Sequence, residues 1–183
     1  MIITISGKPG SGKSTVAEII AKRLKLKHYS MGDMQRGYAK EKGITIEELG
    51  LLESKDDKID LEVDAYQKKL SEKEDNFVID SRLGFHFIPH SKKVFLECQK
   101  DECAKRIYND TIKNRRDSSE RKAKSIKDAK RIMEKREKDN QKRFLKYYQT
   151  DFLDKKNYDI IVDTTDITAE EAAEKILKFI KKH

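Results

Sequence analysis

Residues 7–14, with the sequence GKPGSGKS, constrain the fold of this chain more than any other feature. A glycine, four further residues and then Gly-Lys-Ser form the pattern of a phosphate-binding loop, or P-loop. The apolar, β-branched run at 1–6 predicts a buried strand, and residues 15–24 carry apolar side chains at helical spacing. This order turns backbone N–H groups and the positive end of a helix dipole towards phosphate oxygens. The chain is therefore predicted to bind a nucleoside triphosphate.

The P-loop pattern also predicts what individual residues do. Lys13 is expected to reach the β- and γ-phosphates, and the Ser14 hydroxyl is expected to hold Mg²⁺. The phosphates are expected to lie against Gly7, Lys8, Pro9, Gly10, Ser11, Gly12, Lys13, Ser14 and Thr15.

Length and composition predict one domain in a reducing compartment. With 183 residues, the chain has room for a single core and small inserts. Cys98 and Cys103 fit neither a metal-ligand spacing nor a disulfide framework, and reduced thiols are typical of a cytosolic protein. No signal peptide is expected, because the P-loop strand begins at residue 1, and no apolar run approaches the roughly 20 residues that span a bilayer. We expect a cytoplasmic protein with no membrane partner.

The positive charge of the chain is concentrated in residues 100–150. They contain 18 Lys/Arg and 9 Asp/Glu, while the whole chain has a net charge of +8. The remainder is therefore close to neutral. Three interpretations stay open: a face that binds a polyanion, an arm that closes over nucleotide phosphates, or solvated helices that interleave Lys with Glu.

The alternation of apolar runs and helical patterns predicts an α/β fold. Strands are expected near 2–6, 28–30, 76–80, 93–98 and 158–162, and continuous apolar runs indicate a parallel sheet covered on both faces. Helices are expected near 13–25, 32–42, 45–53, 57–72, 101–115, 120–149 and 168–182. Capping-box patterns at Thr45/Glu48 and Thr168/Glu171 mark two helix starts. Segments 38–72 and 114–130 are longer than a minimal crossover between two parallel strands requires, and we interpret them as helical inserts over the site.

Two further segments predict a second phosphate site at the carboxyl ends of the strands. In residues 30–36, SMGDMQR, Asp33 can cap a helix and Arg36 projects from its first turn. In residues 77–82, FVIDSR, an apolar strand brings Asp80 to the Mg²⁺ side and Arg82 just beyond. Two arginines at adjacent strand ends suit a phosphate, because the guanidinium donates bidentately and stays charged.

These segments together resemble the nucleoside monophosphate kinases. That family combines a P-loop of the form GxPGSGK with a Ser/Thr-x-Gly-Asp-x-x-Arg element, and then with a strand that ends in Asp and is followed by Arg. All three occur here in order. The helix at 57–67 and the ending from 142 to 165 look like those of the short, archaeal-type cytidylate kinases. The resemblance covers nearly the whole chain and implies a P-loop NTPase fold, with 1–183 as a single kinase domain, 38–72 as the acceptor-binding insert and 114–130 as a basic lid.

The resemblance implies roles for the charged residues. Lys13 stabilises charge on the transferred phosphoryl group, while Ser14 and Asp80 organise Mg²⁺. The acceptor phosphate is implied to lie between Arg36 and Arg82. Three further arginines are implied to reach the nucleotides. Arg106 is implied to lie beside the donor ATP. Arg136 and Arg143 are implied to reach the phosphates, and their spacing of seven puts them on the same helix face, two turns apart.

Three positions depart from the family pattern. Ser81 stands where a glycine is usual, and Asn140 lies between Arg136 and Arg143 where cytidylate kinases often have Asp. Lys8 replaces a neutral residue and adds charge near the donor phosphates.

The base of the acceptor is predicted from one helix face. Asp60, Asp64 and Gln67 fall at i, i+4 and i+7. A carboxylate that accepts from an exocyclic amine and an amide that donates to a ring oxygen suit cytosine better than uracil. The same spacing equally describes an exposed acidic face.

The expected reaction is therefore phosphoryl transfer from Mg·ATP to CMP or dCMP by a monomer. The acceptor phosphate is already anionic, so positioning and charge stabilisation replace a general base. Two alternatives stay open: a kinase for another small acceptor such as AMP, and a nucleotide-switched RNA- or ribosome-associated ATPase. The second predicts aromatic residues interleaved with basic ones for stacking, whereas Phe144, Tyr147 and Tyr148 cluster at one helix end as packing residues do. Nucleic acid is therefore not expected as the main partner.

Overall fold

The computed structural model describes residues 1–55, 57–113 and 119–182, with the side chains of 53–64 left out of the description. Within these ranges, five strands form one parallel sheet in the order β2-β3-β1-β4-β5. The strands are β1 (Ile2–Gly7), β2 (Lys27–Ser30), β3 (Phe77–Asp80), β4 (Lys92–Glu97) and β5 (Ile160–Asp163). The predicted α/β fold with five parallel strands is confirmed, and each strand begins and ends within two residues of its expected limits.

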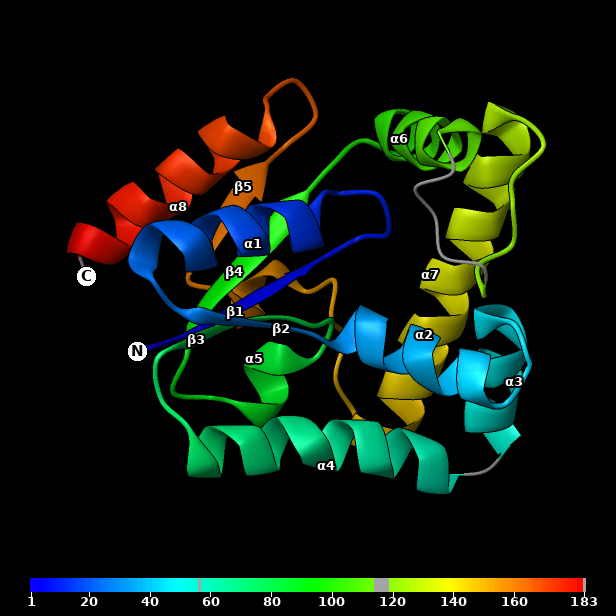
Figure 1. The fold of residues 1–183 in the computed structure, drawn as a ribbon, viewed down its shortest axis with the longest axis horizontal. Helices are drawn as coiled ribbons and strands as arrows, with labels where there is room; N and C mark the ends of the chain where they lie inside the picture. The colour runs from blue at the N-terminus through cyan, green and yellow to red at the C-terminus, as the bar shows by residue number, and fades with distance from the viewer. Residues whose placement is uncertain (56, 114–118, 183) are drawn as a thin grey trace.

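Helices cover both faces of this sheet (Figure 1). In chain order they are α1 (Lys13–Leu24), α2 (Met31–Glu41), α3 (Ile46–Lys55), α4 (Asp57–Lys73), α5 (Gly84–Phe87), α6 (Lys100–Ile112), α7 (Ile126–Tyr148), a 3₁₀ turn (Lys155–Asn157) and α8 (Ala169–Lys182). Figure 1 shows α1 and α8 side by side on one face and α4 and α5 on the other. The helices α2, α3, α6 and α7 gather at one end, towards which the loop after β1 points.

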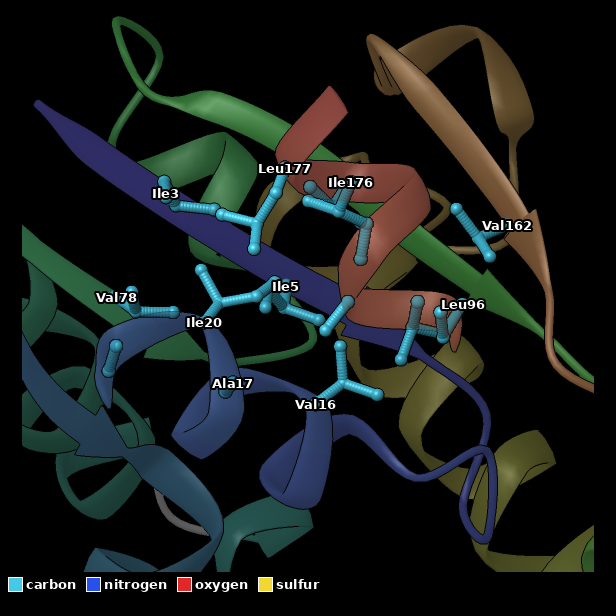
Figure 2. Packing of buried hydrophobic residues seen from close by; sticks show 14 residues of the cluster. Ile3, Ile5, Val16, Ala17, Ile20, Val78, Leu96, Val162, Ile176 and Leu177 are labelled. Carbon is cyan, nitrogen blue, oxygen red and sulfur yellow. The ribbon is translucent and has the colours of Figure 1, made fainter. Parts of the chain in front are cut away.

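The alternation of side chains along β1 builds a core on each face. Ile3 and Ile5 are fully buried and pack against Val16 and Ile20 of α1 and against α8, as Figure 2 shows. Ile2 faces the other way and packs in a second cluster with residues of β3 and α4. Burial on both faces explains why the strands read as continuous apolar runs.

Both predicted capping boxes are present. The backbone N–H of Thr45 donates to Glu48 Oε2 at 2.7 Å, and that of Glu48 donates back to Thr45 Oγ1 at 3.2 Å. The same reciprocal pair joins Thr168 and Glu171 at the start of α8. These bonds satisfy N–H groups that a helix start leaves without partners.

One predicted helix start was wrong, and one short helix was not predicted. The helix expected from residue 120 begins at Ile126, because Ser125 Oγ caps it by accepting from the Asp128 N–H at 3.1 Å. Residues 119–125 therefore form an irregular segment beside the site. The short helix α5 was not predicted, since its single turn gives no periodicity. Of the helix expected at 101–115, α6 accounts for the part up to Ile112, and residues 114–115 lie outside the described ranges.

Candidate active site

The P-loop joins the carboxyl end of β1 to the start of α1 and wraps closely around its glycines. Gly10 and Gly12 have φ of +80° and +87°, in the left-handed region that glycine tolerates. A Cβ on Gly10 would lie 2.7 Å from the carbonyl oxygen of Cys103 in α6, whereas one on Gly12 would meet nothing within 4 Å. The loop conformation therefore depends on glycine at both positions, for different reasons.

Lys13, the first residue of α1, is the cation at the centre of the loop. Its Nζ donates to the Lys8 carbonyl oxygen at 2.8 Å. Burial lowers the pKa of Lys13 to about 7, and the neighbouring positive charges of Arg82 and Arg136 contribute to this shift. The negative charge of Asp80 opposes it. An anion that bound here would favour the charged ammonium.

Asp80 ends β3 beside the P-loop and collects three polar partners. Ser14 Oγ and Ser30 Oγ donate to Asp80 Oδ1 at 3.2 and 3.3 Å, and His28 Nε2 lies 2.8 Å from Oδ2. The strand register explains this, because Ser30 of β2 lies opposite Asp80 and His28 precedes it by two residues on the same face. Asp80 is only 4% exposed. Its carboxylate and the serine hydroxyls supply the hard oxygen atoms that Mg²⁺ prefers.

A cavity of about 880 Å³ opens in front of the P-loop and brings most of the predicted site residues together. Those that line it are Pro9, Gly10, Ser11, Gly12, Lys13, Ser14, Thr15, Asp33, Arg36, Gln67, Asp80, Arg82, Arg106, Arg136 and Arg143. The size is typical of a site for a small ligand.

Gly7 and Lys8 are not among the lining residues. Gly7 is buried under the loop, where a Cβ would lie 2.5 Å from the Leu96 carbonyl oxygen. Lys8 turns its ammonium to Glu97 at 2.6 Å, and Glu97 also pairs with Lys155 at 2.9 Å. The charge of Lys8 is thus neutralised away from the cavity.

Arg36 projects from α2 into the cavity between two carboxylates. Its Nη2 donates to Asp33 Oδ1 within the same helix, and its Nη1 donates to Glu120 Oε1 at 3.4 Å. Burial lowers the pKa of Arg36, but Asp33 and Glu120 more than offset this and leave the pKa raised. The guanidinium therefore stays charged in a half-buried position.

Arg106 lies on α6 at the other side of the P-loop. Its Nη2 donates to the Thr164 carbonyl at 2.6 Å, and its Nε donates to Glu102 Oε1 at 3.0 Å. Thr164 in turn donates from Oγ1 to the Ser11 carbonyl at 3.1 Å. These bonds tie the P-loop, α6 and the end of β5 into one wall.

Arg136 and Arg143 share one face of α7, as their spacing predicted, and both line the cavity. Arg143 is 7% exposed, and its Nη2 donates to Asn140 Oδ1 at 3.3 Å. A second cavity of about 580 Å³ between α3 and α7 shares Arg82 and both α7 arginines with the first. Asn140 and Asp139 line this second cavity beside Arg136 and Arg143.

Two predictions fall outside what the structure describes. Asp60 and Asp64 lie on α4, but their side chains are outside the part of the chain that the structure describes. The arginines at 115 and 116, in the first part of the predicted lid at 114–130, lie in the undescribed range 114–118. Gln67, which lies on α4 with Asp60 and Asp64, is within the described residues; it is 1% exposed and lines the cavity.

Sequence reasoning missed His28, Glu120 and Thr164, and it placed Ser30 in the Ser/Thr-x-Gly-Asp-x-x-Arg element without a contact to Asp80. The contacts of His28 and Ser30 with Asp80 follow from the pairing of β2 with β3, which no local pattern gives. Glu120 was assigned to a helix, so its side chain was not considered. Thr164 follows β5 and reaches the P-loop only through the tertiary fold.

The fold and the site define a P-loop kinase. A parallel sheet with β3 and β4 flanking β1, a GKPGSGKS loop, an aspartate at the next strand end and converging arginines together carry this assignment. Residues 2–166 match the cytidylate kinase-like family, and the chain belongs to that family.

Relatives with similar sequences include cytidylate kinases that match nearly the whole chain. The chain is 34% identical to the cytidylate kinase of Archaeoglobus fulgidus over 182 residues, 99% of this chain and 95% of that protein. It is 36% identical over 181 residues, 98% of its length, to an S-adenosylmethionine-dependent nucleotide dehydratase of Lacinutrix mariniflava. The chain spans only 36% of the length of that second relative.

Solved structures support the fold alone. The shikimate kinase of Bacteroides thetaiotaomicron superposes with a TM-score of 0.65 at 15% identity, over 99% of this chain and 98% of that one. Among the described residues, no helix has the length and apolar character needed to cross a membrane.

Proposed function

We propose that the protein transfers the γ-phosphoryl group of Mg·ATP to a nucleoside monophosphate, with CMP or dCMP as the acceptor, giving ADP and the nucleoside diphosphate. The observation that carries this proposal is the convergence of Arg36, Arg82, Arg136 and Arg143 on the cavity in front of Lys13. A P-loop alone accounts for one phosphate chain. Four further cations around the same cavity suit a second phosphorylated ligand.

The donor phosphates lie on the loop from Pro9 to Thr15, with Lys13 at the β- and γ-phosphates. The glycines of the loop support this, because their left-handed backbone allows N–H groups to turn towards phosphate oxygens. Ser14 and Asp80 would hold Mg²⁺, and their oxygen atoms 3.2 Å apart fit that ion. When bound, the ion would supply positive charge that offsets the charge of the phosphates. Arg106 borders the donor nucleotide.

The acceptor phosphate lies between Arg36 and Arg82, in line with the donor γ-phosphate. Its attacking oxygen is an anion near neutral pH, so the protein has no proton to remove. Lys13, Arg136 and Arg143 stabilise the charge that spreads over the transferred group. Positioning two polyanions at contact distance is the main task, and the arginines perform it by offsetting their repulsion.

The cytosine preference rests on the family and on α4. The relatives named cytidylate kinases cover nearly the whole chain. Gln67 offers an amide at the cavity wall, and Asp60 and Asp64 follow the same helix face by spacing. The relative named as a nucleotide dehydratase also acts on nucleotides. Its name favours a nucleotide as the acceptor over shikimate, after which the fold neighbour from Bacteroides thetaiotaomicron is named.

An RNA-associated ATPase is less well supported. Aromatic residues near the basic helix α7 pack inwards: the rings of Phe144 and Phe152 are 5.6 Å apart edge to face, and those of Tyr148 and Phe87 are 5.1 Å apart. Basic residues along α6 and α7 pair with acidic ones, as Lys130 does with Asp101 at 2.6 Å. Stacking platforms for single-stranded RNA require exposed rings instead.

The test is a coupled assay of ADP release with Mg·ATP and CMP, dCMP, UMP, AMP, GMP or no acceptor. We expect turnover that depends on an acceptor and strongly favours CMP or dCMP. Preference for another acceptor would retain the kinase and correct the base. Hydrolysis that RNA stimulates and no nucleotide accelerates would contradict the proposal.

A further inference from the structure

Glu120 occupies an unexpected place in the cavity. It lies in the irregular segment 119–125 ahead of α7, and it is only 9% exposed. A single carboxylate oxygen, Oε1, accepts from Arg36 Nη1 and from Arg136 Nη1, each at 3.4 Å. An anion of the protein itself therefore lies between Arg36, which the proposed function gives to the acceptor phosphate, and Arg136, which it gives to the transferred phosphoryl group next to that phosphate.

The contacts of Glu120 with Arg36 and Arg136 are suited to replacement by another anion. Guanidinium groups from α2 and α7 converge on one oxygen, as they would on a phosphate oxygen. Both contacts are longer than the 2.7–2.9 Å typical of charge-assisted hydrogen bonds. Arg36 keeps a second partner, Asp33, on its own helix, so its position does not depend on Glu120.

We propose that the Glu120 carboxylate is a built-in competitor of the acceptor phosphate, and that the acceptor binds by displacing it from Arg36 and Arg136. This inference rests on the proposed function for the identity of the acceptor. A phosphate dianion offers more charge and more oxygen atoms than the carboxylate and replaces it. A nucleoside without a phosphate cannot, so Glu120 makes binding selective for phosphorylated acceptors.

The backbone around Glu120 is held independently of its carboxylate. The carbonyl of the preceding residue, Ser119, accepts from the Ile46 N–H at the start of α3 at 2.9 Å. Three residues later, Ala123 is buried against α6 and α7 with Cys103 and Met133. These contacts hold the segment in place when the side chain leaves the arginines, and we expect Glu120→Gln to keep the fold.

The first test measures the binding of CMP and of cytidine by calorimetry to the wild type, Glu120→Gln and Glu134→Gln. Glu134 is the matched control, because it lies on α7, is 43% exposed and contacts Lys100 at 3.7 Å. We expect Glu120→Gln to lower the Kd of CMP by about three- to tenfold, as the loss of one partly buried ion pair allows. The Kd of cytidine is expected to stay unchanged, and Glu134→Gln to behave as the wild type.

A weaker affinity of Glu120→Gln for CMP would overturn the inference, because it would make Glu120 a support for the arginines. Equal changes for CMP and cytidine would overturn it as well, since displacement acts through the phosphate alone. Adding Arg136→Met is expected to abolish most of the gain.

A second measurement separates this inference from the proposed function. Inorganic phosphate is titrated into the three proteins while the unfolding temperature is followed. Binding at the P-loop is common to all three, so a difference between them reports the arginines that Glu120 contacts. We expect Glu120→Gln to reach half of its stabilisation at a several-fold lower phosphate concentration. If Glu120→Gln shows this shift in phosphate affinity but no nucleoside monophosphate is bound or phosphorylated, the proposed function fails and the inference about Glu120 holds. Identical phosphate curves for all three proteins would overturn the inference.

Discussion

His28 and Asp80 form a hydrogen-bonded pair beside the P-loop, with His28 Nε2 2.8 Å from Asp80 Oδ2. The pair joins neighbouring strands, β2 and β3, at their carboxyl ends. Asp80 has Ser14 and Ser30 on its other oxygen, so His28 completes the ring of partners around a carboxylate that is almost fully buried. His28 fixes the orientation of a group that we assign to Mg²⁺.

Replacing His28 by alanine is expected to destabilise the protein and to weaken its use of Mg²⁺. A buried carboxylate that loses a partner costs about 1–3 kcal/mol, which in a domain of this size lowers Tm by about 3–10 °C. The Mg²⁺ concentration that gives half-maximal turnover is expected to rise several-fold. Glutamine keeps a donor at this position and should restore part of both properties, and the exposed His90→Ala should alter neither. An unchanged Mg²⁺ dependence in His28→Ala would show that Asp80 is oriented without His28.

Lys13→Met is expected to abolish turnover without lowering stability. The side chain lies among Arg82, Arg136 and the P-loop, where burial and these charges lower its pKa to about 7. Removal of the ammonium takes away the group that we propose stabilises the transferred phosphoryl, so kcat is expected to fall by about 100-fold or more. It also removes a desolvated charge, so Tm should hold or rise. The exposed Lys22→Met on the same helix is the control for both measurements.

The stability difference between Lys13→Met and the wild type should depend on pH. Below pH 7 the wild type holds a charged ammonium in the folded state, at a cost that its lowered pKa expresses. Between pH 7 and the ordinary pKa of 10.5, the folded state has released this proton while the unfolded state retains it, so wild-type stability rises with pH. Tm measured at pH 6 and pH 9.5 should therefore differ more between the two proteins at pH 6. A constant difference would mean that Lys13 stays charged throughout.

The sequence predicted the sheet well because its signals are local. Continuous apolar runs identify buried parallel strands, and the glycine pattern places β1 and α1 within one residue. The start of α7 was wrong for an equally local reason. Residues 120–149 have a continuous charged pattern, yet the Ser125 hydroxyl takes the N–H of Asp128 and begins the helix at 126.

In the candidate site, too, the residues that local patterns mark were predicted and those that depend on the tertiary fold were not. Lys13, Asp80 and the arginines were predicted because each stands at a strand end or on a helix face that the sequence marks. The partners that orient them were not. His28 reaches Asp80 only because β2 lies next to β3, and Glu120 reaches Arg36 only through the packing of α2 against the segment before α7. Strand order and tertiary packing leave no signal in a single sequence.

Arg36→Met is expected to act on the acceptor and to spare the donor. The guanidinium projects from α2 into the cavity and stays charged between Asp33 and Glu120. Its loss should raise the KM for CMP by about 10- to 100-fold and leave the KM for ATP within about twofold. Steady-state kinetics with each substrate varied in turn measures this. Lys40→Met, exposed on the same helix, is the control, and an equal rise in both constants would place Arg36 at the donor.

Gly10→Ala and Gly12→Ala should separate backbone strain from close packing in the P-loop. Both positions have left-handed φ, which costs alanine about 1–2 kcal/mol. Only at Gly10 would the new Cβ also meet the Cys103 carbonyl oxygen, at 2.7 Å. Thermal unfolding should therefore show a clearly larger loss of Tm for Gly10→Ala. Equal losses would mean that contact between the loop and α6 contributes little to stability.

Gln67→Leu tests how the cavity contacts the acceptor base. Gln67 is almost fully buried on α4 and lines the cavity, where its amide can donate to the ring oxygen of a pyrimidine. Cytosine and uracil both carry that oxygen. The substitution is therefore expected to lower kcat/KM for CMP and UMP by the same factor, about 10- to 100-fold, because a buried ligand oxygen loses its donor.

The base preference itself is expected to reside in the carboxylates of α4, since only cytosine offers an amine to them. Asp64→Asn should narrow the ratio of kcat/KM for CMP over UMP, and Gln67→Leu should leave that ratio unchanged. Lys68→Gln, exposed beside Gln67, is the control for both. If Gln67→Leu alone changes the ratio, the amide, rather than the carboxylates, distinguishes the two bases.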